Sequence, residues 1–170
     1  RGLAYDQDSH SLFVTDEISD RVMVFDVAEI TDGEDAIGVL GQTTFVAGAD
    51  TTEEDGFHQP EGIFFESGTR KLYIADAANS RVSVYEMPTL TTSSIDSAHT
   101  AGDSYSQSFT VSNSQGIVSL ELVSGSLPTG LSFSGTELSG TPSAVGTYTF
   151  EMRAVDAVSP GEFYSDTKSF

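Results

Sequence analysis

Short apolar runs separated by polar or glycine-bearing turns fill the first half of the chain. The runs at residues 62–66, 71–76 and 81–85 are rich in Val, Ile, Phe and Tyr, and Ser67-Gly68-Thr69 separates the first two. Runs of this length and composition predict β-strands rather than helices. Apolar residues occupy both alternate faces of the runs, which is typical of a sheet that packs between two neighbouring sheets.

The same pattern occurs twice, at a spacing of 60 residues. Residues 2–25 align without a gap with residues 62–85. The matching pairs include Gly2 with Gly62, Leu12 with Leu72, Asp16 with Asp76, Arg21 with Arg81 and Val22 with Val82. Repetition at a fixed spacing predicts a repeat architecture. Small sheets that need a neighbour on each face indicate the blades of a β-propeller.

Two motifs in the second copy give the repeat a family likeness. Ile74-Ala75-Asp76 and Asn79-Ser80-Arg81-Val82 resemble NHL repeats, in which a Leu-Tyr-Val-Ala-Asp strand end and an Asn-x-Arg-Val turn recur. The first copy departs from this pattern at Thr15 and Asp20. The resemblance covers about residues 1–87 and implies two blades of a larger NHL-type β-propeller.

The outer strands of the two blades differ. Residues 36–40 are expected to form the outer strand of the first blade, whereas no such strand follows Tyr85. A closed propeller often completes its last blade with a strand from its other end. We therefore expect residues 62–85 to be the last blade of a longer chain. Two blades cannot close a ring, so apolar blade surface should stay open or be buried against another chain.

The repeated acidic and basic residues are interpreted as structural. Asp16 and Asp76 are expected to accept backbone N–H bonds in the turn between the second and third strands. Arg21 and Arg81 would pair with these carboxylates or lie across the edge of the blade. A binding role for the four residues is the alternative.

The pattern changes after residues 88–94, a Thr- and Ser-rich segment that we interpret as a linker. Candidate strands follow at 106–111 and 117–123. Between residues 146 and 156 apolar and polar residues alternate, which predicts a strand with one face on a core and one face in water. Regularly spaced turn signals favour an antiparallel β-sandwich of immunoglobulin-like type.

An ordered series of motifs supports that fold. Leu-Pro-Thr-Gly-Leu at 127–131, Leu-Ser-Gly-Thr-Pro at 138–142 and Gly-Thr-Tyr-Thr-Phe at 146–150 resemble the Ig-like (cadherin-like, He_PIG-type) repeats of bacterial surface proteins. The resemblance implies that residues 95–170 form a spacer or adhesion module without a catalytic residue. Its last strand, entered at 163–170, is expected to be incomplete. Truncation of the chain and head-to-tail assembly through open β edges are both left open.

Charge limits the classes of partner. The net charge of −19, from 26 acidic and 7 basic residues, argues against nucleic acid, whose phosphates need Lys and Arg. It fits a soluble surface, a salt-rich habitat or divalent-cation binding. The candidates for Ca²⁺ are Asp50, Glu53, Glu54, Asp55, Asp96, Asp103 and Asp156. The first four lie in the long loop expected at residues 45–59, which lacks the alternating oxygen positions of an EF-hand, so a solvated loop is the alternative there. For Asp96, Asp103 and Asp156 the alternative is a carboxylate that caps a turn.

Catalytic motifs do not emerge from the sequence. The histidines His10, His58 and His99 have no metal-binding spacing, and no serine lies in a Gly-x-Ser-x-Gly motif. We therefore expect no catalytic residue and no cofactor other than Ca²⁺. No apolar run in the sequence is long enough to cross a bilayer. Some NHL propellers are metal-dependent lyases with channel histidines, and His58 is the candidate nearest to the expected channel mouth.

Two function classes follow. The first is a non-enzymatic extracellular or cell-surface protein, in which the propeller binds a protein or a glycan and the Ig-like domain acts as an adhesion, spacer or filament-assembly module. The alternative is an enzyme of metal-dependent lyase or hydrolase type, whose site would lie on blades outside these residues.

Overall fold

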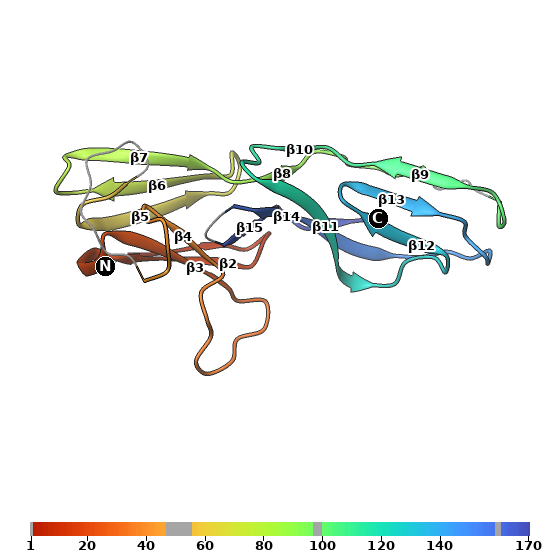
Figure 1. The fold of residues 1–170 in the computed structure, drawn as a ribbon, viewed down its shortest axis with the longest axis horizontal. Coiled ribbons are helices and arrows are strands. Elements are labelled where there is room, and N and C mark those ends of the chain that lie inside the picture. The colour runs from red at the N-terminus through yellow and green to blue at the C-terminus, as the bar shows by residue number, and fades with distance from the viewer. Residues whose placement is uncertain (1, 47–55, 97–99, 159–160) are drawn as a thin grey trace. The chain divides into compact units, whose positions relative to one another are not determined.

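The chain forms two compact β units in the computed structural model (Figure 1). The structure describes residues 2–46, 56–96, 100–158 and 161–170. The first unit comprises Arg1–Met87 and Val158–Phe163, and the second comprises Pro88–Ala157 and Tyr164–Phe170. The strands pair in antiparallel fashion, an isolated parallel bridge joins Gly41 to Gly56, and one 3-10 turn, Glu17–Ser19, accompanies the strands of the described ranges. The all-β class expected from the sequence is confirmed.

Two antiparallel meanders make up most of the first unit (Figure 1). Short turns connect neighbouring strands, except that a longer loop, residues 27–37, joins β3 to β4, and the order in each sheet is the order in the chain. The first sheet contains β1 (Leu3–Asp6), β2 (Ser11–Asp16), β3 (Arg21–Asp26) and β4 (Gly38–Leu40); the second contains β5 (Pro60–Glu66), β6 (Lys71–Asp76) and β7 (Arg81–Glu86). The outer strand expected at 36–40 is present as β4.

The sequence repeat is also a repeat of backbone geometry. Asp16 lies opposite Arg21 in the first sheet, as Asp76 lies opposite Arg81 in the second. The hairpin turns match as well, because equivalent non-glycine residues adopt the left-handed conformation. Their φ angles are 55° at His10 and 52° at Arg70, and 51° at Asp20 and 54° at Ser80. The two copies therefore fold into the same unit strand by strand.

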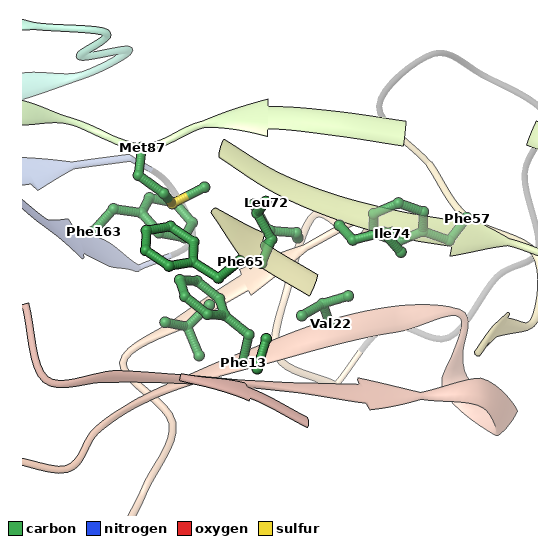
Figure 2. Packing of buried hydrophobic residues seen from close by; sticks show 11 residues of the cluster. Phe13, Val22, Phe57, Phe65, Leu72, Ile74, Met87 and Phe163 are labelled. Atoms are coloured by element: carbon green, nitrogen blue, oxygen red, sulfur yellow. The ribbon is translucent and has the colours of Figure 1, made fainter. Parts of the chain in front are cut away.

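One hydrophobic core lies between the two sheets. Phe13 from β2 stacks on Phe65 from β5, with ring centroids 5.8 Å apart (Figure 2). Alternate residues of each strand enter this core, as the period of two in a β-strand requires. The cluster contains Ala4, Phe13, Val22, Val24, Leu40, Phe57, Phe65, Leu72, Ile74, Met87 and Phe163.

A segment from late in the chain completes the first unit. The N–H of Glu162 donates to the carbonyl of Ile37 at 2.9 Å, and Gly161 forms a β-bridge with Gly38 beside β4. Phe163 then enters the core of the first unit. The motif series placed residues 158–163 with the Ig-like domain, and the structure differs there because these residues pair with Ile37 and Gly38.

The second unit contains sheets in the order β12-β13-β9 and β11-β14, with β15 and β16 both along the other edge of β14, and a β8-β10 pair. Its core is built around Leu138, Phe150 and Met152. The strands are β8 (Thr89–Leu90), β9 (Tyr105–Ser108), β10 (Val111–Ser112), β11 (Ile117–Gly125), β12 (Leu131–Ser134), β13 (Glu137–Gly140), β14 (Phe150–Ala157) and β16 (Lys168–Ser169), together with the end of β15 (Glu162–Tyr164), which begins in the first unit.

Three expectations for the second half differ from the structure. Residues 88–94 are not a free linker throughout, because β8 pairs with β10 and Leu90 is fully buried. The strand expected at 106–111 is interrupted, and the strand expected from 146 begins at Phe150. The second face of β14 is not in water, since Arg153 and Val155 are buried. Arg153 is covered because the Glu121 side chain and the Tyr164 ring lie against it.

Candidate functional site

The repeated aspartate and arginine form an ion pair in each sheet. Arg21 Nε lies 2.8 Å from Asp16 Oδ2, and Arg81 Nε lies 2.7 Å from Asp76 Oδ2. Each arginine also donates to a carbonyl of the segment that connects the two sheets. Arg21 donates to Phe45, and Arg81 donates to Gly56 at 2.6 Å. Each pair therefore clamps the connecting segment against the end of its own sheet.

The carboxylates of these clamps favour the charged form. Burial alone would raise the pKa of Asp76, but the backbone N–H of His58, the side chain of Asn79 and the Arg81 guanidinium together lower it below its ordinary value. The pKa of Asp16 is lowered in the same way, since hydrogen bonds from Ser19 and Arg21 and the Arg21 charge outweigh burial. Both clamps are ionised at neutral pH.

A buried ion pair joins the two sheets. Asp6 Oδ2, at the end of β1, lies 2.9 Å from Arg70 Nη1, in the turn between β5 and β6. Both side chains are almost completely buried, and the Arg70 guanidinium also lies over the Phe65 ring at 5.7 Å. The sequence motifs did not predict this pair. A signal for it is the acidic residue that both copies carry at this position, Asp6 in the first and Glu66 in the second.

Two further hydrogen bonds cross between the sheets. The hydroxyl of Thr15 donates to the carbonyl of Glu61 at 3.0 Å, and the N–H of Gln59 donates to Asp20 Oδ1 at 2.7 Å. Thr15 and Asp20 stand where the second copy has Ala75 and Ser80. The structure gives these differences between the copies a physical reason, because both side chains bond the segment that leads into the second sheet.

Each sheet leaves one apolar face outside the core. We call Leu3, Tyr5, Leu12 and Val14 the first-sheet outer face, and Phe64, Tyr73, Val82 and Val84 the second-sheet outer face. Along β1, β2 and β6 these residues alternate with buried ones, and along β7 Val82 and Val84 alternate with half-buried ones. Leu3 is 68% exposed and Val82 is 63% exposed. Adjacent exposed apolar side chains of this kind mark an interaction surface more often than scattered ones do.

The calcium candidates do not come together in the described ranges. Asp156 is buried and accepts the N–H groups of Gln115 at 2.7 Å and Gly116 at 2.8 Å, so its oxygens hold a turn. Asp96 and Asp103 are exposed. No group of three or more His, Asp or Glu side chains in the described ranges is placed to hold a metal ion. Asp50, Glu53, Glu54 and Asp55 lie outside the described residues, as does His99.

The other two histidines lie in the first unit. The N–H of His58 donates to Asp76 at 2.7 Å, which holds this residue beside the second clamp. His10 lies in the turn between β1 and β2, and its Nδ1 is buried without a hydrogen-bond partner in the described ranges. Thus the two described histidines occupy different turns of the first unit.

The second unit has an open cavity of about 490 Å³. Aromatic and proline side chains line it, among them Tyr105, Tyr148, Pro128 and Pro142. Burial, with a contribution from the charge of Asp96, raises the pKa of the Tyr105 hydroxyl, so the phenol stays protonated at neutral pH.

No helix in the described part of the chain has the length and hydropathy of a membrane span.

Comparison with known proteins identifies the second half. The sequence profile of the family described as Putative Ig domain (He_PIG) matches residues 88–170. The chain therefore contains an Ig-like domain of this family, as the motif series indicated. No curated protein and no solved structure was found that matches the chain.

Proposed function

We propose that this chain, whose residues 88–170 form an Ig-like domain, belongs to a non-enzymatic extracellular or cell-surface protein. Residues 1–87 serve as two blades of an NHL-type β-propeller that binds a protein or a glycan. The Ig-like domain serves as an adhesion or spacer module. The observation that carries the proposal is that one chain contains both a domain of the He_PIG family and two repeat-equivalent β-meanders that pack face to face on each other.

The geometry favours one end of the blades as the ligand surface. The turns at 17–20 and 77–80 follow the clamped ends of β2 and β6, and the clamps hold Phe45 and Gly56 of the connecting segment at the same end. Loops fixed by a rigid scaffold are the usual place for binding residues. Ile18, 78% exposed in the first of these turns, presents an aliphatic side chain to a ligand.

Ligand binding and location test the proposal. The purified chain is applied to a glycan array and to a panel of extracellular proteins, and antibodies against it are applied to intact cells of the source organism. We expect surface labelling and a ligand whose binding falls about tenfold in Ile18→Lys and is unchanged in Ile30→Lys, an exposed aliphatic residue in the loop between β3 and β4. Labelling only after cell lysis contradicts the proposal.

An enzymatic role is tested on the same material. Elemental analysis of the purified chain, followed by assays for metal-dependent lyase and hydrolase turnover, addresses the alternative class. We expect no stoichiometric transition metal and no turnover. Turnover that disappears on chelation would replace the binding function with the enzymatic one.

A further inference from the structure

We propose that the two outer faces form a heterologous interface, through which a second copy of this chain docks head to tail. The second-sheet outer face of one copy covers the first-sheet outer face of the next. The inference rests on the proposed function only in treating the two sheets as repeats of one blade. Its evidence is the interface that the two sheets already form with each other.

Each outer face is the repeat equivalent of one side of that buried interface. Sixty residues after Leu3, Tyr5, Leu12 and Val14 stand Ile63, Phe65, Leu72 and Ile74, which pack in or against the core between the sheets. Sixty residues before Phe64, Tyr73, Val82 and Val84 stand Ala4, Phe13, Val22 and Val24, which all belong to the same core. The open faces are thus the repeat equivalents of the two halves of one known contact.

The polar partners across the interface repeat in the same sense. In the buried interface, Asp6 of the first sheet pairs with Arg70 of the second at 2.9 Å. The equivalent of Asp6 at the open end is Glu66, and the equivalent of Arg70 at the other open end is His10. His10 Nδ1 is buried without a partner in the described ranges. Docking of a second copy brings a carboxylate to this imidazole, which can donate a hydrogen bond to it.

A glycine marks the same contact. A Cβ at Gly2 would lie 2.8 Å from the carbonyl oxygen of Glu61 and 2.9 Å from Ile63 Cγ2, because the second sheet approaches closely there. The equivalent glycine, Gly62, has only Ala75 Cβ nearby, at 3.6 Å. The space beside Gly62 is therefore open at the position where the next sheet would approach.

The contact between copies lacks two bonds of the contact within a copy. Thr15 and Asp20 bond the second sheet through a hydroxyl and a carboxylate, whereas the equivalent Ala75 has no hydroxyl and the equivalent Ser80 has no carboxylate. We therefore expect reversible association. Because the two faces differ, the assembly is head to tail and either closes into a ring or grows as a filament.

A complementation experiment tests the geometry. Leu3→Lys disables the first-sheet outer face, Val82→Lys disables the second-sheet outer face, and Ile30→Lys is the matched control; all three side chains are exposed. Sedimentation velocity is recorded over a concentration series, with circular dichroism as the check of folding. We expect the wild type and Ile30→Lys to assemble beyond a dimer and each face variant to remain monomeric. An equimolar mixture of the two face variants should form a dimer and no larger species.

The Glu66–His10 contact is tested separately. Because a hydrogen bond to a charged group is stronger than a neutral one, Glu66→Gln should raise the dissociation constant about tenfold, and His10→Arg should lower it about tenfold. The left-handed backbone at His10 already suits arginine, since Arg70 has nearly the same φ. In the double variant, the gain from His10→Arg should disappear.

Several results overturn the inference. They are a wild type that stays monomeric at its highest soluble concentration, a face variant that assembles like the wild type, a mixture that stays monomeric, or an arginine at position 10 that acts independently of Glu66. A monomeric chain would leave ligand binding at the turns intact. Conversely, loss of surface labelling would leave the assembly intact, so the two proposals fail separately.

Discussion

Asp16 and Asp76 occupy the same repeat position but differ in burial. The Asp76 side chain is fully buried and accepts hydrogen bonds from His58, Asn79 and Arg81. The Asp16 side chain is 27% exposed. Breaking a buried ion pair costs much more than breaking an exposed one, because the remaining partner stays desolvated. The same motif should thus contribute unequally to stability in the two copies.

Asp76→Asn should lower the unfolding free energy by about 2–4 kcal/mol, because it removes the charge that holds Arg81 and the N–H of His58. Asp16→Asn is the matched control and should cost about 1 kcal/mol or less. Urea unfolding followed by circular dichroism measures both. Equal losses would show that burial does not distinguish the two clamps.

Stability should also fall in acid. The folded pKa of both clamp carboxylates lies below the ordinary value of 3.8, so the folded state binds fewer protons than the unfolded state. The contribution is therefore fully present above the unfolded pKa and is lost as the pH falls through the folded pKa. Thermal melting of the wild type and of Asp16→Asn/Asp76→Asn checks this. The difference between their midpoints should shrink below about pH 4; a constant difference would contradict the assignment.

At the scale of the element, the turns after β2 and β6 both use the left-handed backbone conformation, which is sterically unfavourable for a residue with a Cβ atom. Asp20 and Ser80 are both left-handed, with φ of 51° and 54°. Asp20 gains a compensating hydrogen bond from Gln59, while the equivalent Ser80 is exposed. Glycine adopts this conformation without steric cost.

Ser80→Gly should therefore stabilise the first unit by about 0.5–1 kcal/mol. Asp20→Gly relieves the same strain but loses the bond to Gln59, so it should be neutral or destabilising by about 1 kcal/mol. Chemical unfolding of the two variants gives the comparison. If Asp20→Gly proved as stabilising as Ser80→Gly, the bond to Gln59 would have no net value.

Sequence pattern predicted the strands best where the pattern recurs. The six strands of the two copies follow from apolar runs that occur twice, and the Asp76–Arg81 pair follows from a local turn motif. The buried Asp6–Arg70 pair is not local, since its members lie in different copies. Alternation in β14 identified Phe150 and Met152 as core residues but not the burial of Arg153. That burial depends on Glu121 of β11 and on the Tyr164 ring, whose centroid lies 3.5 Å from the guanidinium carbon.

At the scale of the whole molecule, the units are not contiguous in sequence. Val158–Phe163 belongs to the first unit, although the family match places it within residues 88–170. Gly161 permits the approach, because its φ is 133° and a Cβ would lie 2.4 Å from the Ile37 carbonyl oxygen. Sequence pattern could not show this, since the pairing partner lies more than a hundred residues earlier.

Phe163→Ala should therefore destabilise the first unit, by about 3 kcal/mol, because it opens a cavity in the core between the two sheets. Hydrogen exchange resolves the location. Amides of β6 should lose protection while those of β13 keep it. Phe150→Ala, in the core of the second unit, is the matched control and should produce the reverse pattern. Loss of protection confined to the second unit in Phe163→Ala would contradict the assignment.

The late arrival of Phe163 has a consequence for biosynthesis. During translation the ribosome releases both meanders well before Val158–Phe163, so their shared core stays unfinished for roughly 4–15 seconds at about 5–20 residues per second. A nascent chain in this interval exposes the apolar surfaces of its sheets to other proteins in the cell. Holding chaperones, or slow codons placed after residue 163, should therefore matter more for the yield of this protein than for one whose domains emerge complete in order.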